Sequence, residues 1–158
     1  MDDKSRLEGI FNGLQAIQTE IDLPVIFPMH PRTQKMLSSF GISPEGIRII
    51  PPVGFFEFLQ LEANARLVLT DSGGVQEETC ILGVPCVTIR ENTERPETID
   101  VGSNILAGTD SGSIVMAARK MMESRGGWTN QFGDGKAGKR IVEISTTLKP
   151  DDGDKRCP

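Results

Sequence analysis

Short apolar runs alternate with segments of helical periodicity along most of this chain. Residues 3–21 repeat apolar side chains at helical spacing, and residues 25–27 follow as a continuous apolar run, which is typical of a buried parallel strand. Repeated alternation of this kind predicts parallel βαβ units. We therefore expect an α/β fold, a Rossmann-like three-layer sandwich with helices on both faces of one parallel sheet. The expected helices cover about residues 3–21, 32–40, 54–64, 74–82, 114–122 and 141–148, and the expected strands about 25–27, 47–50, 67–69, 84–89 and 104–106.

The length of 158 residues suits one domain. We expect residues 1–148 to form that domain and the polar residues 149–158 to be a disordered tail. In the helix expected at 54–64, four apolar residues are available for the buried face: Phe55, Phe58, Leu59 and Leu61.

Charge and hydropathy exclude several classes of partner. The formal net charge is -5 and the sequence pI is about 4.9, whereas nucleic acids and anionic membranes bind basic surfaces. No apolar run approaches the ~20 residues of a membrane helix, and the first residues lack the apolar core of a signal peptide. The sequence therefore predicts a cytoplasmic domain with no nucleic-acid or membrane partner.

The cysteines and the single histidine argue against a metal site. Cys80, Cys86 and Cys157 form no C-x-x-C pair, and His30 is the only histidine, so the usual zinc ligand sets are missing. Cys80 and Cys86 lie in apolar stretches, which favours buried, unreactive side chains. We expect neither a metal nor another cofactor.

A Ser-Gly-Gly sequence stands where the third expected strand gives way to a helix. Ser72, Gly73 and Gly74 follow the strand directly, at the edge where parallel sheets bind ligands. Unpaired N–H groups at a helix start, together with a hydroxyl and two glycines that let a ligand approach, favour an anion site, most naturally for phosphate. The alternative is a tight turn in which Ser72 only caps the helix.

Other polar residues lie near the expected ends of the same strands. Glu77 and Glu78 come just inside the helix, where one carboxylate could accept hydrogen bonds from ribose hydroxyls and the other only complement the helix dipole. Arg95, held before a proline, could bind a diphosphate or lie in a solvated loop. His30, between two prolines, could contact phosphate, transfer a proton or be structural. Together these residues favour a nucleotide site.

The same segments resemble a known family in their order and spacing. The motifs are His-Pro at 30–31, T-D-S-G-G-V-Q-E-E at 70–78, L-G-V-P at 82–85, R-E-N-T-E-R-P-E at 90–97 and G-D-G-x-A at 133–137. Over about residues 5–148 the chain is similar to the carboxyl-terminal half of the non-hydrolysing UDP-N-acetylglucosamine 2-epimerases. That resemblance implies one half of a GT-B fold.

The resemblance also implies an activity and roles for single residues. The family interconverts UDP-N-acetylglucosamine and UDP-N-acetylmannosamine by eliminating UDP to a glycal and adding it back after protonation of the opposite face. By the matching motifs, Glu78 would hold the ribose hydroxyls, and Arg95 would face the phosphates or the sugar. His30 would lie near the leaving diphosphate as the catalytic residue of this half. Phe58 would pack near the uracil, unless it belongs to the helix core. The diphosphate itself would be bound by Ser72, Gly73 and Gly74.

The chain departs from the family in two ways. Residues 130–132 lack the usual Asn-Pro, and family members are roughly twice as long, with proposed acid and base residues in an amino-terminal domain that is not in this sequence. The resemblance therefore predicts a UDP-sugar-binding half that is inactive without an amino-terminal epimerase domain, or that self-associates through its cleft face. The alternatives are a UDP-sugar sensor, a glycosyltransferase donor domain, and, less favoured, an independent enzyme that relies on His30.

Overall fold

The computed structural model describes residues 3–124 and 126–147. The tail predicted at 149–158 lies outside these residues. Helices and strands alternate as the periodicity predicts. The helices are α1 (Lys4–Ile21), α2 (Pro31–Phe40), α3 (Phe55–Ala63), α4 (Gly73–Leu82), α5 (Pro96–Asp100), α6 (Ser111–Met122) and α7 (Ala137–Thr147), and the strands are β1 (Ile26–Pro28), β2 (Arg48–Ile50), β3 (Val68–Thr70), β4 (Cys86–Thr88) and β5 (Asn104–Leu106).

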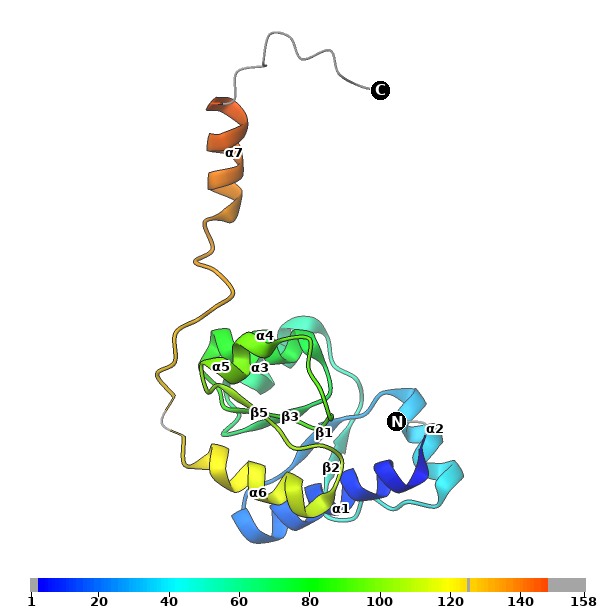
Figure 1. Ribbon diagram of the computed structural model, residues 1–158. Helices are drawn as coiled ribbons and strands as arrows, with labels where there is room; N and C mark the ends of the chain where they lie inside the picture. The colour runs from blue at the N-terminus through cyan, green and yellow to red at the C-terminus, as the bar shows by residue number, and fades with distance from the viewer. Residues whose placement is uncertain (1–2, 125, 148–158) are drawn as a thin grey trace, which may run out of the picture.

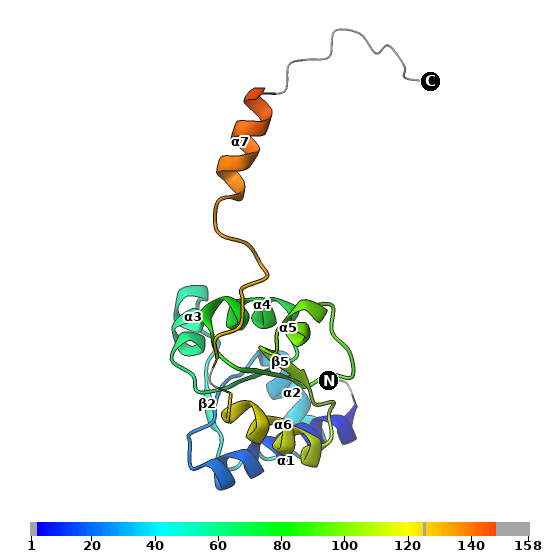
Figure 2. The same ribbon diagram turned by 60° about the vertical axis from the view of Figure 1, so that its left-hand side comes forward.

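All the described strand pairs are parallel, which confirms the predicted fold class. Their hydrogen bonds form two small sheets rather than the one expected: β1 pairs with β2, and β4 lies between β3 and β5. Helices α3, α4 and α5 cover one face, while α1 and α6 cover the other (Figures 1 and 2). Because strands within each sheet run in one direction, β3, β4 and β5 end at a common edge, where loops can meet a ligand.

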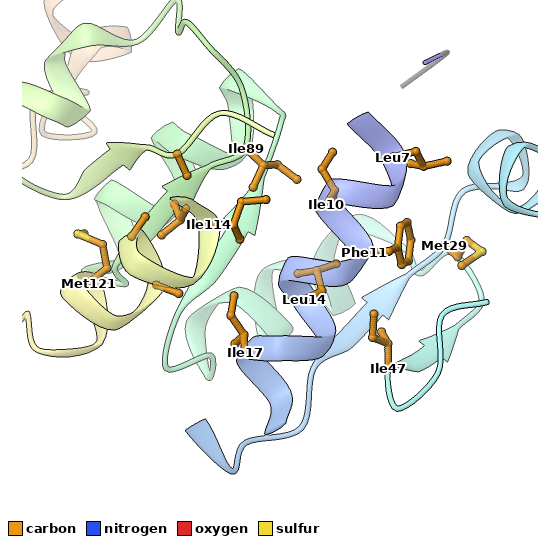
Figure 3. Close-up of a cluster of buried hydrophobic side chains, with 14 of the residues drawn as sticks. Leu7, Ile10, Phe11, Leu14, Ile17, Met29, Ile47, Ile89, Ile114 and Met121 are labelled. Atoms are coloured by element: carbon orange, nitrogen blue, oxygen red, sulfur yellow. The ribbon is translucent and has the colours of Figure 1, made fainter. Parts of the chain in front are cut away.

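The core lies mainly between the strands and the α1–α6 layer. Six residues of α1 are buried, and they pack with Ile114 and Met121 of α6 and with Val87 of β4 (Figure 3). Phe11 meets Phe27 edge to face, with 5.7 Å between ring centroids. A Cβ added at Gly13 would lie 3.1 Å from Ile114, so a residue without a side chain lets the two helices approach.

Helix boundaries follow local capping signals. The Asp3 side chain accepts a hydrogen bond from the Arg6 N–H, and that of Asp110 accepts one from the Ser113 N–H. Helix α4 ends at Gly83, whose φ of 75° is the left-handed conformation that glycine adopts readily. Cys80 and Cys86 are buried as expected, at 2% and 0% exposure.

Several features differ from the sequence-based expectation. In α3, Phe58, Leu59 and Leu61 are half-buried, but Phe55, which was predicted for the same face, is 62% exposed, and the acidic Glu62 is 2% exposed. A further short helix, α5, begins at Pro96, near the end of the motif at 90–97, and runs to Asp100. Helix α7 forms as expected but stands off the body of the molecule and has no buried residue (Figure 1).

None of the described helices is both long enough and apolar enough to cross a membrane.

Candidate functional site

The turn between β3 and α4 presents an uncapped helix start. Ser72 occupies the N-cap position, but its side chain makes no capping hydrogen bond within the described part of the chain. Its N–H donates to Thr70 Oγ1 at 3.0 Å, and its carbonyl accepts from the Gln76 N–H at 3.3 Å. The alternative interpretation, in which Ser72 only caps the helix, requires a side-chain hydrogen bond that Ser72 does not make among the described residues. Its exposed hydroxyl and the first N–H groups of α4 lie at the positive end of the helix.

Gly73 and Gly74 are not required by the packing of this chain. Neither has a positive φ, and an added Cβ would meet nothing closer than a Glu94 oxygen at 3.5 Å or Ser72 Oγ at 3.8 Å. By contrast, a Cβ at Gly9 would lie 2.4 Å from the Thr109 carbonyl oxygen. Two glycines that the fold does not need keep the turn open, as an anion bound to backbone N–H groups requires.

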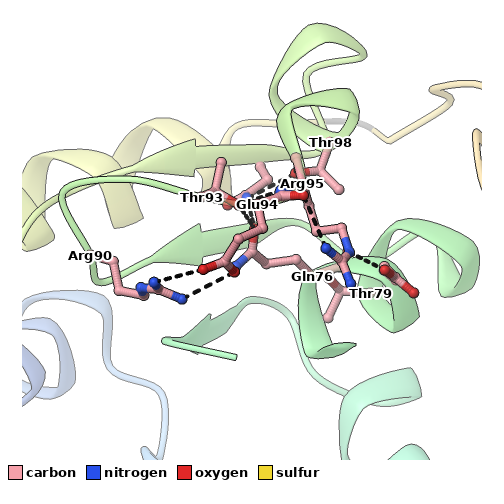
Figure 4. A network of polar contacts seen from close by, with 9 residues as sticks. Gln76, Thr79, Arg90, Thr93, Glu94, Arg95 and Thr98 are labelled. Carbon is pink, nitrogen blue, oxygen red and sulfur yellow. Dashed lines mark hydrogen bonds and ion pairs between the residues drawn. The ribbon is translucent and has the colours of Figure 1, made fainter. Parts of the chain in front are cut away.

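The segment at 90–97 folds against α4 and brings two arginines to this turn. Arg95 Nε forms an ion pair with Glu77, and Arg95 Nη1 donates to the Glu94 carbonyl at 3.0 Å (Figure 4). The Arg95 guanidinium carbon lies 3.9 Å from the position of a Cβ at Gly73. The structure thus brings Arg95 together with the Ser-Gly-Gly turn, as the nucleotide interpretation expects. It also assigns Glu77 a role in holding Arg95.

Arg90 forms the second pair in this segment. Its guanidinium donates to both Glu94 carboxylate oxygens, at 3.0 and 3.4 Å, and to the Asp71 carbonyl at 3.4 Å. Hydrogen bonding and the positive charge of Arg90 lower the pKa of Glu94. Arg90 thereby ties the segment to the residue that precedes the Ser-Gly-Gly turn. Arg90 belongs to the motif at 90–97, but no role was predicted for it from the sequence.

A buried hydrogen-bond network joins the 90–97 segment to α4 and to β5. Gln76 Oε1 accepts from Thr93 Oγ1 at 2.5 Å and from Asn104 Nδ2 at 3.2 Å (Figure 4). Asn104 also donates to Thr98 Oγ1 and accepts from Thr88 Oγ1. Because buried polar groups need partners, this network fixes the segment relative to α4 and β5. Sequence reasoning missed it, although polar residues at inward strand positions were a signal.

His30 and Phe58 stand apart from these contacts. His30 follows β1 and is exposed, and its Nδ1 accepts a hydrogen bond from the Arg32 N–H at 3.2 Å, so the ring caps α2. Phe58 is half-buried on α3. Among the described contacts, no hydrogen bond joins His30 to the 71–78 or 90–97 segments. The predicted roles of both residues therefore stay predictions.

Glu78 lies half-buried on α4, and a second carboxyl group stands beside it. Glu62 of α3 is 2% exposed, and neither of its oxygens has a hydrogen-bond donor among the described residues. Burial, then the charge of Glu78 and a hydrogen bond with it, raise the pKa of Glu62 to about 7. Glu62 had no predicted role; the one signal in the sequence was its place between Leu61 and Ala63, in the mostly apolar second half of α3.

No group of three or more His, Cys, Asp or Glu side chains within residues 3–124 and 126–147 is arranged to hold a metal ion.

Comparison with known proteins identifies the family. The family model described as UDP-N-acetylglucosamine 2-epimerase matches residues 1–146, nearly the whole chain. The chain belongs to the UDP-N-acetylglucosamine 2-epimerase family. It corresponds to the carboxyl-terminal domain of that family, which confirms the resemblance expressed by the motifs.

Two curated relatives in this family are 51% and 40% identical to the chain over the aligned residues. The UDP-N-acetylglucosamine 2-epimerase of Methanocaldococcus jannaschii is 51% identical over 151 residues, which cover 92% of this chain and 41% of the relative. The UDP-2,3-diacetamido-2,3-dideoxy-D-glucuronate 2-epimerase of Pseudomonas aeruginosa is 40% identical over 151 residues and is likewise covered to 41%. The chain thus spans less than half the length of either enzyme.

A solved epimerase structure shares the fold. The crystal structure of the M. jannaschii UDP-GlcNAc 2-epimerase in complex with UDP-GlcNAc and UDP superposes with a TM-score of 0.84, over 92% of this chain and 41% of that one. The predicted GT-B-like α/β architecture is therefore confirmed at the level of the fold.

Proposed function

We propose that this chain is the UDP-sugar-binding half of a UDP-N-acetylglucosamine 2-epimerase, and that it requires an amino-terminal domain for catalysis. The observation that carries the proposal is the open start of α4. Ser72 leaves this helix uncapped, and two glycines that the packing does not need keep it accessible. Glu78 follows on α4 as an acceptor for ribose hydroxyls, and the Arg95 guanidinium lies against Gly73 and supplies positive charge for the diphosphate.

Each residue has a role in this proposal. The Ser72 hydroxyl and the N–H groups of Gly73 and Gly74 bind the diphosphate, where the helix dipole favours negative charge. The Arg95 guanidinium, held by Glu77, faces the phosphates or the sugar. The Glu78 carboxylate accepts hydrogen bonds from the ribose hydroxyls.

Two further residues complete the proposed site. Phe58 packs near the uracil. His30 lies near the diphosphate leaving group, where its ring can hold or transfer a proton.

The requirement for a second domain follows from chemistry and length. Epimerisation at carbon 2, which carries the acetamido group, needs proton transfer on two faces of that carbon, and a single histidine cannot reach both. The chain covers 41% of the M. jannaschii epimerase. The partner we propose is accordingly an amino-terminal epimerase domain. Without it, the chain would pair through the cleft face of its own site with a second copy.

The substrate class rests on what the relatives share. Both curated relatives act on UDP-sugars at carbon 2, and they differ in the sugar. The higher identity is to the enzyme named for UDP-N-acetylglucosamine, 51% against 40%. We assign UDP-N-acetylglucosamine and its C2 epimer as the substrates. The UDP part of either substrate binds to this half.

Calorimetric titration of the purified chain with UDP in EDTA tests the proposed site. We expect one-to-one binding without metal, and Glu78→Ala should weaken it by about 1–3 kcal/mol because a partner of ribose is lost. Glu45→Ala is the matched control, because Glu45 is exposed and precedes β2, which belongs to the other sheet. Absence of binding, or equal affinity of Glu78→Ala and the parent, would contradict the assignment.

A second experiment tests the need for a partner domain. The chain alone should not convert UDP-N-acetylglucosamine. Addition of the amino-terminal portion of the M. jannaschii relative, which this chain does not cover, should restore conversion if the two halves assemble. Conversion by the chain alone would overturn the half-enzyme proposal.

A further inference from the structure

Glu62 is the one charged residue that is buried in the described part of the chain. It sits near the end of α3, is 2% exposed, and neither of its carboxylate oxygens meets a hydrogen-bond donor there. An ionised carboxylate in such a place loses its hydration without compensation. A carboxyl group in this position is stabilised by binding a proton, provided that an acceptor is close by.

The Glu78 carboxylate is that acceptor. It stands on α4, the helix that packs against α3, and it is the side chain whose charge and hydrogen-bonding capacity raise the pKa of Glu62 beyond the effect of burial. Two ionised carboxylates only accept hydrogen bonds, so neither can satisfy the other until one carries a proton. Because Glu62 is the more buried of the two, the shared proton belongs on Glu62.

The surroundings support this arrangement. Besides Glu78, the titratable group that interacts with Glu62 is Cys86 of β4, whose pKa burial raises to about 12, so the thiol stays neutral. The pKa of Glu62, raised to about 7 chiefly by burial, agrees with a proton that remains bound near neutral pH.

We propose that Glu62 is a positioning residue, which in its protonated form donates a hydrogen bond to Glu78 so that the Glu78 carboxylate is held ready for the hydroxyls of the nucleotide. Glu62 itself touches no ligand. The inference rests on the proposed function, because that is where Glu78 is assigned to the ribose. It adds a pH dependence to the affinity of the nucleotide site, because the hydrogen bond to Glu78 exists only while Glu62 is protonated.

Two variants of Glu62, compared with the parent chain, separate this role from simple burial. Glu62→Gln keeps a donor in the same shape and never ionises. Glu62→Met fills a similar volume but donates nothing. The parent chain donates only while Glu62 is protonated. Glu45→Gln, an exposed change just before β2 in the other sheet, controls for nonspecific effects.

The test compares UDP affinity from about pH 5.5 to about pH 8.5 by calorimetry in EDTA. The phosphate of UDP changes charge in this range as well, so the informative quantity is the ratio of parent to Glu62→Gln affinity, in which contributions common to both chains cancel. We expect a ratio near one at the acid end that falls about tenfold at the basic end, as Glu62 ionises beside Glu78. Glu62→Met should bind more weakly than Glu62→Gln throughout.

An infrared titration without nucleotide reads the proton directly. The parent should keep a protonated-carboxyl C=O band near neutral pH that is missing in Glu62→Gln. UDP binding without this band, or equal affinities of Glu62→Gln and Glu62→Met, would overturn the role of Glu62 alone. The band together with no UDP binding at any pH would instead overturn the proposed function and, with it, this positioning role.

Discussion

At the scale of single residues, the stability of this protein is expected to depend on pH through Glu62. The pKa of this buried group is about 7 in the folded chain against an ordinary 4.5. The folded state therefore binds more protons than the unfolded state between these values, and stability falls as pH rises through this range. Glu94, Asp110 and Asp134 have lowered pKa values, so their contributions are lost only as pH falls below their ordinary range.

Urea unfolding of the parent and of Glu62→Gln at acid and at basic pH measures this contribution. Near pH 5 the two chains should be similar in stability. Above pH 7 the variant should be more stable by about 3 kcal/mol, since it has no carboxylate to ionise in the interior. A constant difference between the chains at all pH values would contradict a raised pKa at Glu62.

Arg95 combines two contacts that a lysine could not reproduce. Its Nε pairs with Glu77 while Nη1 donates to the Glu94 carbonyl, so the planar guanidinium is held from two sides. Arg95→Lys should therefore weaken UDP binding by about 1–3 kcal/mol, because a single ammonium keeps the charge but not the fork. Calorimetry with UDP measures the change. Equal affinity would show that only the charge at position 95 matters.

At the scale of elements, the packing of α1 against its neighbours depends on glycine. A Cβ at Gly9 would lie 2.4 Å from the Thr109 carbonyl oxygen, a backbone atom that cannot turn away. Gly9→Ala should destabilise the chain by about 1–3 kcal/mol through overpacking, despite the better helix propensity of alanine.

Gly138 provides the matched comparison for that substitution. It lies in α7, and a Cβ there would meet nothing within 4 Å. Gly138→Ala should leave the unfolding free energy of the body unchanged within about 0.5 kcal/mol. If denaturant unfolding gave the same destabilisation for both variants, the loss at Gly9 could not be attributed to the contact with Thr109.

At the scale of the whole molecule, α7 is separate from the folded body. It buries no residue, and Ile141, Val142 and Ile144 are 56–63% exposed (Figure 2). Helices of this length are marginal in water when nothing packs against them. We therefore expect the body to fold without α7.

Removal of residues 137–158 tests this expectation. The melting temperature of the shortened chain should stay within about 2 °C of the parent, because no described buried surface is lost. In the full chain, α7 amides should exchange hydrogen faster than those of α1 or α6. A drop of more than about 5 °C would show that α7 contributes to the core.

The sequence by itself determined the order of all the described elements but α5, and it predicted a candidate site at the end of β3. Periodicity and capping are local signals, so Asp3, Asp110 and the short apolar runs predict where helices and strands begin. The Ser-Gly-Gly turn was also visible, because a strand end, a hydroxyl and two glycines are adjacent in the chain.

Only the tertiary structure decided which side chains meet. Glu77 holds Arg95, Asn104 supports the 90–97 segment from β5, and Glu62 lies buried beside Glu78 while Phe55 faces solvent. The division of the strands into two sheets and the separation of α7 were equally absent from the pattern. These outcomes depend on contacts between residues far apart in the chain, whose energies the local sequence does not encode.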